Sequence, residues 1–111
     1  MFVINATSNK VITKVPLGNS PLGVAVSPDG KKVYVTNFIG NTTSVIDTTS
    51  NTVTATVPVG TYPSGVAVIP DGTKVYVTNR DDNTISVIDT AKNSVIATIK
   101  VGDEPEEIAV S

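Results

Sequence analysis

The segment Val33-Tyr34-Val35-Thr36-Asn37 occurs twice in the chain, and its second copy, Val75-Tyr76-Val77-Thr78-Asn79, lies 42 positions later. Ser44-Val45-Ile46-Asp47 recurs at the same spacing as Ser86-Val87-Ile88-Asp89. Because the spacing is the same for both pairs, no loop of one copy carries an insertion relative to the other. A fixed period of this length is the signature of a repeat architecture.

Within one repeat, turn residues separate four short runs that are rich in β-branched residues. The first run ends at Pro28-Asp29-Gly30, in which Pro sets φ for a turn, Asp bonds nearby amides and Gly accepts a positive φ. Runs of this length with turn signals between them predict an all-β fold. The runs are Gly23–Val26, Lys32–Asn37, Ser44–Asp47 and Val53–Val57.

Four antiparallel strands in about 40–45 residues correspond to one blade of a β-propeller. A β-sandwich would also satisfy the number of strands. Sandwich strands need not repeat in sequence, however, so the fixed period favours propeller blades. The sequence contains no stretch with the apolar period of a helix, which excludes helical solenoids.

The period predicts a partial propeller over residues 1–111, an open arc of about 2.6 blades with eleven strands. Residues 1–17 hold the third and fourth strands of one blade, residues 22–59 and 64–101 hold complete blades, and residues 106–111 hold the first strand of another. A closed ring needs ~4–8 blades. We therefore expect a fragment of a larger propeller, whose partners are other blades of that propeller or other copies of the chain.

The repeated motifs resemble the YVTN β-propeller repeat over nearly the whole chain. That family includes archaeal surface-layer proteins and bacterial secreted or periplasmic proteins. The resemblance implies rings of usually seven blades, an extracellular, cell-surface or periplasmic location, and binding or structural roles more often than catalysis. Glu107 departs from the pattern because it replaces a glycine. The motifs are Tyr34–Asn37, Ser44–Asp47, Asn51-x-Val53 and Gly60-x-x-Pro63-x-Gly65-Val66-Ala67-Val68.

Composition excludes several functions. The net charge is −2 and the only arginine is Arg80, so no basic patch for nucleic acid or an anionic membrane surface is present. The chain has no cysteine and no histidine, which removes disulfides, thiolate metal sites and the commonest general base. No apolar run is long enough for membrane insertion, and Met1–Asn5 does not resemble a signal peptide. We expect no catalytic residue, no metal site and no cofactor.

The best candidates for ligand binding are loop positions that differ between the copies, because a residue that recurs with the repeat serves the repeat. A protein or a glycan would suit such loops. The loop that contains Arg80 also offers carboxylates for Ca²⁺, but no other loop supplies ligands, so a solvated polar loop is favoured. The candidate binding residues are Phe38, Ile39, Tyr62, Arg80, Asp81 and Asp82.

The recurring residues have structural interpretations. Tyr34 and Tyr76 are expected to pack between blades, over the small Ala25 or Ala67 of a neighbour. The recurring aspartates and asparagines are expected to bond backbone amides in turns. These residues are Asp29, Asp71, Asn37, Asn79, Asp47 and Asp89.

Two further features have both a functional and a structural interpretation. Asn5-Ala6-Thr7 and Asn41-Thr42-Thr43 match the glycosylation acceptor pattern, although Asn and Thr are common in such turns anyway. The acidic cluster of Asp103, Glu104, Glu106 and Glu107 is interpreted as a solvated segment, which in a full ring would lie near a channel mouth and repel anions.

The sequence thus favours a non-enzymatic binding or cell-surface structural module. The alternative is part of a propeller enzyme, lactonase-like or quinoprotein-like, whose active-site residues lie in blades outside this chain.

Overall fold

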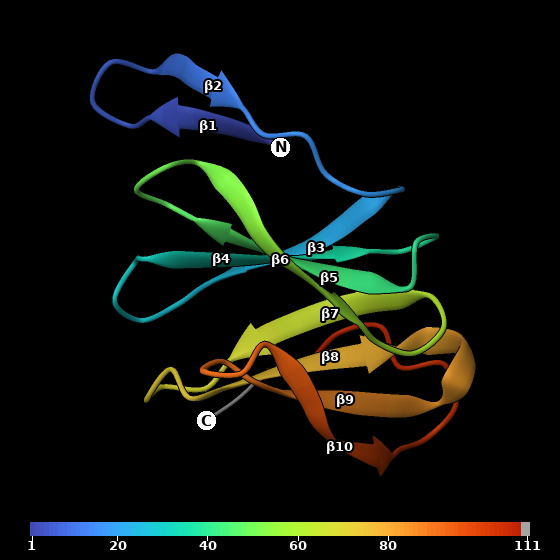
Figure 1. The fold of residues 1–111 in the computed structure, drawn as a ribbon. Coiled ribbons are helices and arrows are strands. Elements are labelled where there is room, and N and C mark those ends of the chain that lie inside the picture. The colour runs from blue at the N-terminus through green and yellow to red at the C-terminus, as the bar shows by residue number, and fades with distance from the viewer. Residues whose placement is uncertain (110–111) are drawn as a thin grey trace.

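Ten strands form three antiparallel sheets in the computed structural model, which describes residues 1–109 (Figure 1). The N-terminal hairpin consists of β1 (Phe2–Asn5) and β2 (Lys10–Lys14). The first blade consists of β3 (Pro21–Val26), β4 (Lys32–Asn37), β5 (Thr42–Asp47) and β6 (Thr52–Pro58). The second blade consists of β7 (Pro63–Val68), β8 (Lys74–Asn79), β9 (Thr84–Asp89) and β10 (Ser94–Lys100), with a 3-10 turn at Arg80–Asp82.

Both blades are meanders in which each strand pairs with the next one along the chain. Equivalent residues pair in both sheets: Ala25 lies opposite Tyr34, and Ala67 lies opposite Tyr76. β3 and β7 begin with proline, which is tolerated there because each is the edge strand of its sheet. The prediction of four-stranded antiparallel blades in an open, partial propeller is confirmed.

The prediction of a strand over residues 106–111 is wrong for the part that the structure describes. Residues 105–109 have no strand assignment, and positions 110 and 111 lie outside the described residues. A strand needs a ladder partner. No strand within residues 1–109 pairs with this segment, so the count is ten strands and not eleven.

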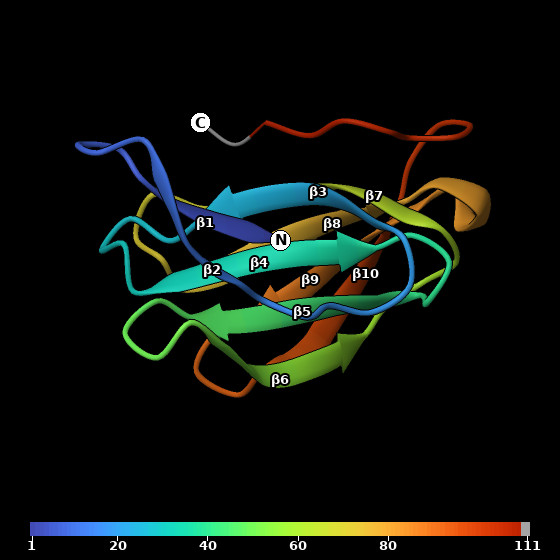
Figure 2. The same cartoon turned by 90° about the horizontal axis from the view of Figure 1, so that it is seen from above.

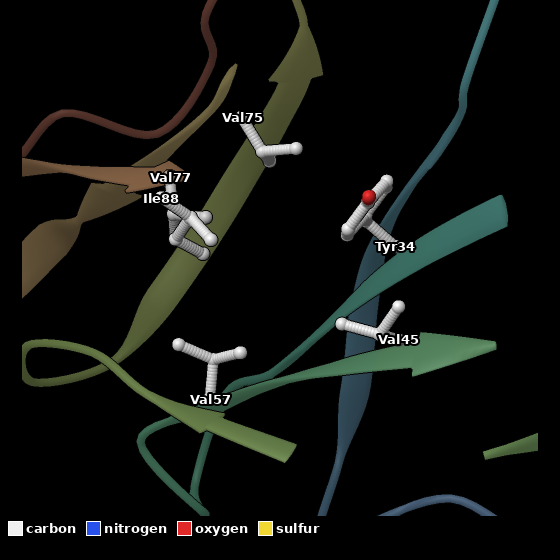
Figure 3. Close-up of a cluster of buried hydrophobic side chains, with 6 residues drawn as sticks. All are labelled: Tyr34, Val45, Val57, Val75, Val77 and Ile88. Carbon is white, nitrogen blue, oxygen red and sulfur yellow. The ribbon is translucent and has the colours of Figure 1, made fainter. Parts of the chain in front are cut away.

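The largest buried apolar cluster lies between the two blades (Figure 3). Tyr34 has 2% of its surface exposed, which confirms that it packs between blades. Ala25 is not its neighbour from another blade, because Ala25 pairs with Tyr34 inside the same sheet. The cluster contains Tyr34, Val45 and Val57 from the first blade and Val75, Val77 and Ile88 from the second.

A second cluster joins the N-terminal hairpin to the first blade. Val15, which follows β2, packs with Val35 and Ile46, and Met1 and Val3 of the hairpin border them. Apolar surface thus holds the three sheets in a row, in sequence order, as Figure 1 shows. Among residues 1–109, no helix is long and apolar enough to cross a membrane.

Antiparallel order places alternate connections at opposite ends of the blades. We call the end with the connections after β2, β4, β6, β8 and β10 the loop end; it lies at the right in Figure 2. The tight turns after β1, β3, β5, β7 and β9 lie at the left. All six candidate binding residues fall in connections at the loop end.

Candidate functional site

The loop end is held in place by a buried asparagine at the end of each second strand. Asn37 Nδ2 donates to Thr42 Oγ1 at 3.0 Å and to Ser44 Oγ at 2.9 Å. Asn79 makes the equivalent bonds in the second blade, and its Oδ1 also accepts from the Gly60 amide at 3.0 Å. The recurring asparagines therefore fix the backbone on which the variable loop residues stand.

A buried threonine in each second strand connects neighbouring blades. Thr36 Oγ1 accepts from the Gly23 amide at 2.8 Å and donates to the Ser64 carbonyl, in the next blade, at 2.8 Å. Thr78 Oγ1 accepts from the Gly65 amide at 2.7 Å and donates to the Glu106 carbonyl at 3.2 Å. This role was not predicted from the sequence, although the recurrence of a polar residue within an apolar strand indicates it.

The recurring aspartates serve turns at the opposite end, as expected. Asp47 Oδ1 accepts from the Ser50 and Thr49 amides, and these bonds, with Lys32 at 3.3 Å from Oδ2, hold the pKa of Asp47 below its usual range. Hydrogen bonds from Ser27 Oγ and the Lys31 amide lower the pKa of Asp29.

The Asp71 carboxyl has the same role in the second blade. Its pKa is lowered by bonds from the Thr73 hydroxyl and amide. All three of these carboxylates are occupied by the turns in which they lie.

At the loop end, the structure brings Phe38 and Tyr62 together from loops that are 24 positions apart in sequence. Their rings stack with centroids 4.8 Å apart and an interplanar angle of 13°. Backbone bonds fix the pair: the Phe38 amide donates to the Ser20 carbonyl at 2.9 Å, and the Tyr62 amide donates to Asn41 Oδ1 at 3.0 Å. This aromatic pair joins the two blades.

Arg80 extends from the equivalent loop of the second blade toward the C-terminal segment. Its Nε lies 3.4 Å from Glu106 Oε1, an ion pair by distance in which Nε makes no hydrogen bond among the described residues. The Arg80 amide donates to the Tyr62 carbonyl at 3.1 Å. Three of the six candidates, Phe38, Tyr62 and Arg80, therefore lie in one connected group.

The other three candidates lie apart from that group. Ile39 is exposed and lines no hollow of the described surface with the others. Asp82 Oδ2 accepts from the Thr61 amide at 2.9 Å, so its carboxylate serves the loop. Asp81 borders another hollow, of about 530 Å³, with Asn83, Asp103 and Glu104, and Arg80 is the one residue that this hollow shares with the connected group. Among residues 1–109, no three or more His, Cys, Asp or Glu side chains gather as a metal site would require.

A groove of about 540 Å³ runs across the edge of the blades where the first strands lie. We call it the first-strand groove. Its volume is within the range of ligand pockets, roughly 300–1,000 Å³. Its side chains come from three successive copies of the repeat: Leu22, Val24 and Phe38 from the first blade, Ser64, Val66 and Arg80 from the second, and Glu106 and Glu107 from the C-terminal segment.

Glycine makes the floor of this groove. A Cβ atom at Gly65 would lie 2.5 Å from the Glu106 carbonyl oxygen, so no other residue fits without moving the backbone. The glycine therefore lets the C-terminal segment approach β7 closely. This approach repeats, one repeat of 42 residues later, the approach of β7 to β3. Phe38 and Arg80 were predicted from the sequence, but this groove was not. The residues that line the groove come from copies of the repeat that are 42 positions apart.

The two asparagines of the glycosylation pattern take part in local bonds. Asn5 Oδ1 accepts from the Thr7 and Ser8 amides, and Asn41 Oδ1 accepts from Tyr62. Thr43, the third residue of the Asn41 motif, is buried. These contacts give both motifs a structural role.

The fold and the recurring contacts agree with a comparison against known families. The family of YNCE-like β-propellers matches residues 26–110. The chain belongs to this family. As a YNCE-like propeller chain it carries the blade repeat through both full blades and into the C-terminal segment. No curated protein matches the chain significantly in sequence.

Solved structures similar to this YNCE-like chain include one enzyme and proteins whose names state no activity. Hydrazine synthase of Kuenenia stuttgartiensis is 33% identical with a TM-score of 0.79, over 85% of this chain and 27% of its own. A protein of unknown function from Desulfotomaculum acetoxidans is 22% identical with a TM-score of 0.83, over 99% and 38%. Apo AztD of Citrobacter koseri is 20% identical with a TM-score of 0.80, over 98% and 30%. The chain thus spans well under half the length of these proteins.

Proposed function

We propose that this chain is part of a YVTN-type propeller that works as a non-enzymatic binding module, with the first-strand groove as its binding site. One observation carries the proposal: positions that differ between copies of the repeat meet around this groove. Equivalent positions hold Leu22, Ser64 and Glu106, and the two second-strand loops contribute Phe38 and Arg80.

The recurring residues, in contrast, all have structural tasks. Tyr34 is in the core, Thr36 bonds the next blade, Asn37 fixes a loop and Asp47 caps a turn. Side chains that recur serve the repeat, whereas function in a common fold depends on the residues that vary. The variation within this one chain therefore supports the groove as the functional surface.

The proposal extends to partners and location. Exposed apolar side chains on β3 and β10, Val26 and Ile99 among them, support contact with other blades of a larger propeller or with other copies of the chain. A protein or a glycan is the proposed ligand. The YVTN resemblance supports an extracellular, cell-surface or periplasmic location.

A ligand screen on sparsely immobilised chain tests this proposal. The chain is exposed to a displayed peptide library and to a glycan array, and the hits are measured again with Phe38→Ala and with Lys92→Ala. Lys92 is exposed in a turn at the opposite end, so it provides the control. We expect hits whose binding is lost with Phe38→Ala and kept with Lys92→Ala. Binding that survives both substitutions would contradict the proposed site.

The likeness to a hydrazine synthase at 33% identity favours a second candidate. In that case the chain is part of a propeller enzyme, lactonase-like or quinoprotein-like, whose reacting groups lie in other blades. Turnover of a lactone panel by a chain extended with further blades, and not by this chain alone, would support the enzyme and overturn the binding module.

A further inference from the structure

We infer that the first-strand groove binds an extended peptide that carries a lysine or arginine beside an apolar residue. This inference rests on the binding role proposed above and adds the chemistry of the ligand. Three independent features of the groove support it: its charge, its apolar part and the strand edges that border it.

Carboxylates outnumber cations at the loop end and in the C-terminal segment. The loops at the loop end and the C-terminal segment hold six of the ten carboxylates, of which Glu106 and Glu107 line the groove, and one cation, Arg80, which lines it too. Lys14 and Lys100 are the last residues of β2 and β10 at the same end. Glu106 is within ion-pair distance of Arg80, whereas Glu107 forms no ion pair among residues 1–109. A cationic ligand would therefore meet a complementary field in the groove. The six are Asp81, Asp82, Asp103, Glu104, Glu106 and Glu107.

The opposite part of the groove is apolar. Leu22 and Val24 of β3 are 61% and 62% exposed, because the N-terminal hairpin leaves β3 uncovered. Tyr62 stacks on Phe38, and Phe38 lines the groove. An aliphatic stem and a neighbouring apolar residue can cover Leu22 and Val24, and an ammonium or guanidinium group can approach the aromatic pair. The groove thus changes from apolar to acidic along its length.

Two strand edges favour a peptide over a compact cation. β3 and β7 are each the terminal strand of a four-stranded sheet, so the outer edge of each strand takes no part in a ladder. Figure 2 shows β3, β7 and the C-terminal segment along the same side of the molecule. An extended peptide can add to such an edge through main-chain hydrogen bonds while its side chains occupy the groove.

Binding to the sparsely immobilised 111-residue chain tests the inference with defined probes. The first probe is a blocked pentapeptide of sequence Ala-Leu-Lys-Leu-Ala. The second replaces Lys by Glu, the third replaces the second Leu by Pro to remove a backbone donor, and the fourth is butylammonium. We expect the lysine peptide to bind about tenfold more tightly than the glutamate peptide, and its affinity to fall as salt is added.

The variants separate the contributions of charge and apolar surface. Glu107→Gln is expected to weaken the lysine peptide about threefold to fivefold, the size of an exposed ion pair, and Leu22→Ser to weaken all three peptides, since each contains leucine. Asp29→Asn, at the opposite end, is the matched control for loss of one carboxylate and should leave binding unchanged. Circular dichroism checks that each variant keeps its strands.

Other outcomes contradict the inference in distinguishable ways. Equal binding of the lysine and glutamate peptides would show that charge does not select the ligand. Equal binding of butylammonium and the lysine peptide, or full binding of the proline peptide, would show that strand addition is wrong. A response that grows with the density of immobilised chain would assign the groove to a second copy. If a glycan or neutral peptide from the screen binds and requires Phe38, the binding module stands and this inference fails.

Discussion

The two blades have nearly the same sequence pattern but differ in how much of it they bury. Tyr34 in the first blade is 2% exposed, whereas Tyr76, its equivalent, is half-buried. Val57 is 1% exposed, whereas its equivalent Ile99 is 45% exposed. The first blade has a sheet on each side and the second has one on one side only. Burial in this chain is therefore determined by neighbouring blades more than by residue type.

The first strands show the opposite difference. Val24 and Val26 of β3 are exposed, whereas Val66 and Val68 of β7 pack against the core between the blades. The N-terminal hairpin supplies only two strands, so it covers Val35 and Ile46 but leaves β3 open. Each blade thus lacks a neighbour over a different part of its surface.

The largest expected effect of these open faces is on assembly. We expect the isolated chain to oligomerise or aggregate, because exposed apolar faces and unpaired strand edges favour association. Val26→Lys together with Ile99→Lys, one substitution for each open side, should shift the distribution toward monomer, and so should extension of the chain by further blades. Size-exclusion chromatography with light scattering measures the mass. A monomeric wild type at high concentration, with cooperative unfolding, would show that the open faces are tolerated.

The tyrosine pair gives the next largest effect. Tyr34→Ala removes a fully buried ring and should lower the free energy of unfolding by about 3–5 kcal/mol. Tyr76→Ala removes a half-buried ring and should cost about 1–2 kcal/mol. Urea unfolding measures both changes in free energy in the background of the Val26→Lys, Ile99→Lys variant, which is expected to be monomeric. Equal costs would mean that the second blade is covered to the same extent as the first.

The threonine that connects the blades should have a smaller effect. Thr36→Val leaves the half-buried Gly23 amide and the buried Ser64 carbonyl without this hydroxyl, at a cost of about 1–3 kcal/mol. Thr78→Val should cost less, because Ser64 Oγ still donates to the Glu106 carbonyl at 2.9 Å.

Thr43→Val is the matched control for that pair. Thr43 is buried and its hydroxyl has no hydrogen-bond partner among the described residues, so its loss should be neutral or slightly stabilising. A cost for Thr43→Val equal to that for Thr36→Val would show that the bond between blades contributes nothing.

The smallest expected effect is a loss of folding stability at low pH. The folded pKa of Asp47 lies below the usual value of 3.8, so the carboxylate contributes stability above that pH, and this contribution is lost as the pH falls through the folded pKa. Because the amides of Ser50 and Thr49 are the main cause, Lys32→Met should raise the pKa only slightly and leave it below 3.8. An NMR titration of the Asp47 carboxyl measures both values. A pKa that returns to 3.8 in the variant would assign the effect to the lysine.

Much of the fold could be predicted because the turns are marked in the sequence. β4 has the predicted bounds Lys32–Asn37, and β3 and β5 each begin two residues earlier than their predicted runs. Proline and glycine punctuate the repeat, and the period fixes how strands group into blades. The strand predicted over residues 106–111 is absent from residues 106–109, because periodicity specifies a pattern but not the presence of a pairing partner.

The candidate site was harder to predict than the fold. Phe38 and Arg80 were found because they differ at equivalent positions, and Tyr62 because it differs from Ser20. Their meeting around one groove depends on the distance between neighbouring blades, which glycines such as Gly65 set and which no local pattern encodes. The acidic residues Glu106 and Glu107 were noticed only as a solvated cluster, because their position beside Arg80 and β7 is a tertiary contact.

The hydrogen bonds donated by the Thr36 and Thr78 hydroxyls also suit a folding order that runs from the N-terminal blade to the C-terminal one. Each threonine belongs to the earlier blade, and the carbonyl it bonds belongs to the next segment along the chain. During synthesis, segments fold in order from the N-terminus. A folded blade therefore presents its threonine hydroxyl and an apolar face to the strand that emerges next, and that strand buries both. Each added blade therefore covers the exposed face of the blade before it and provides the surface against which the next blade packs.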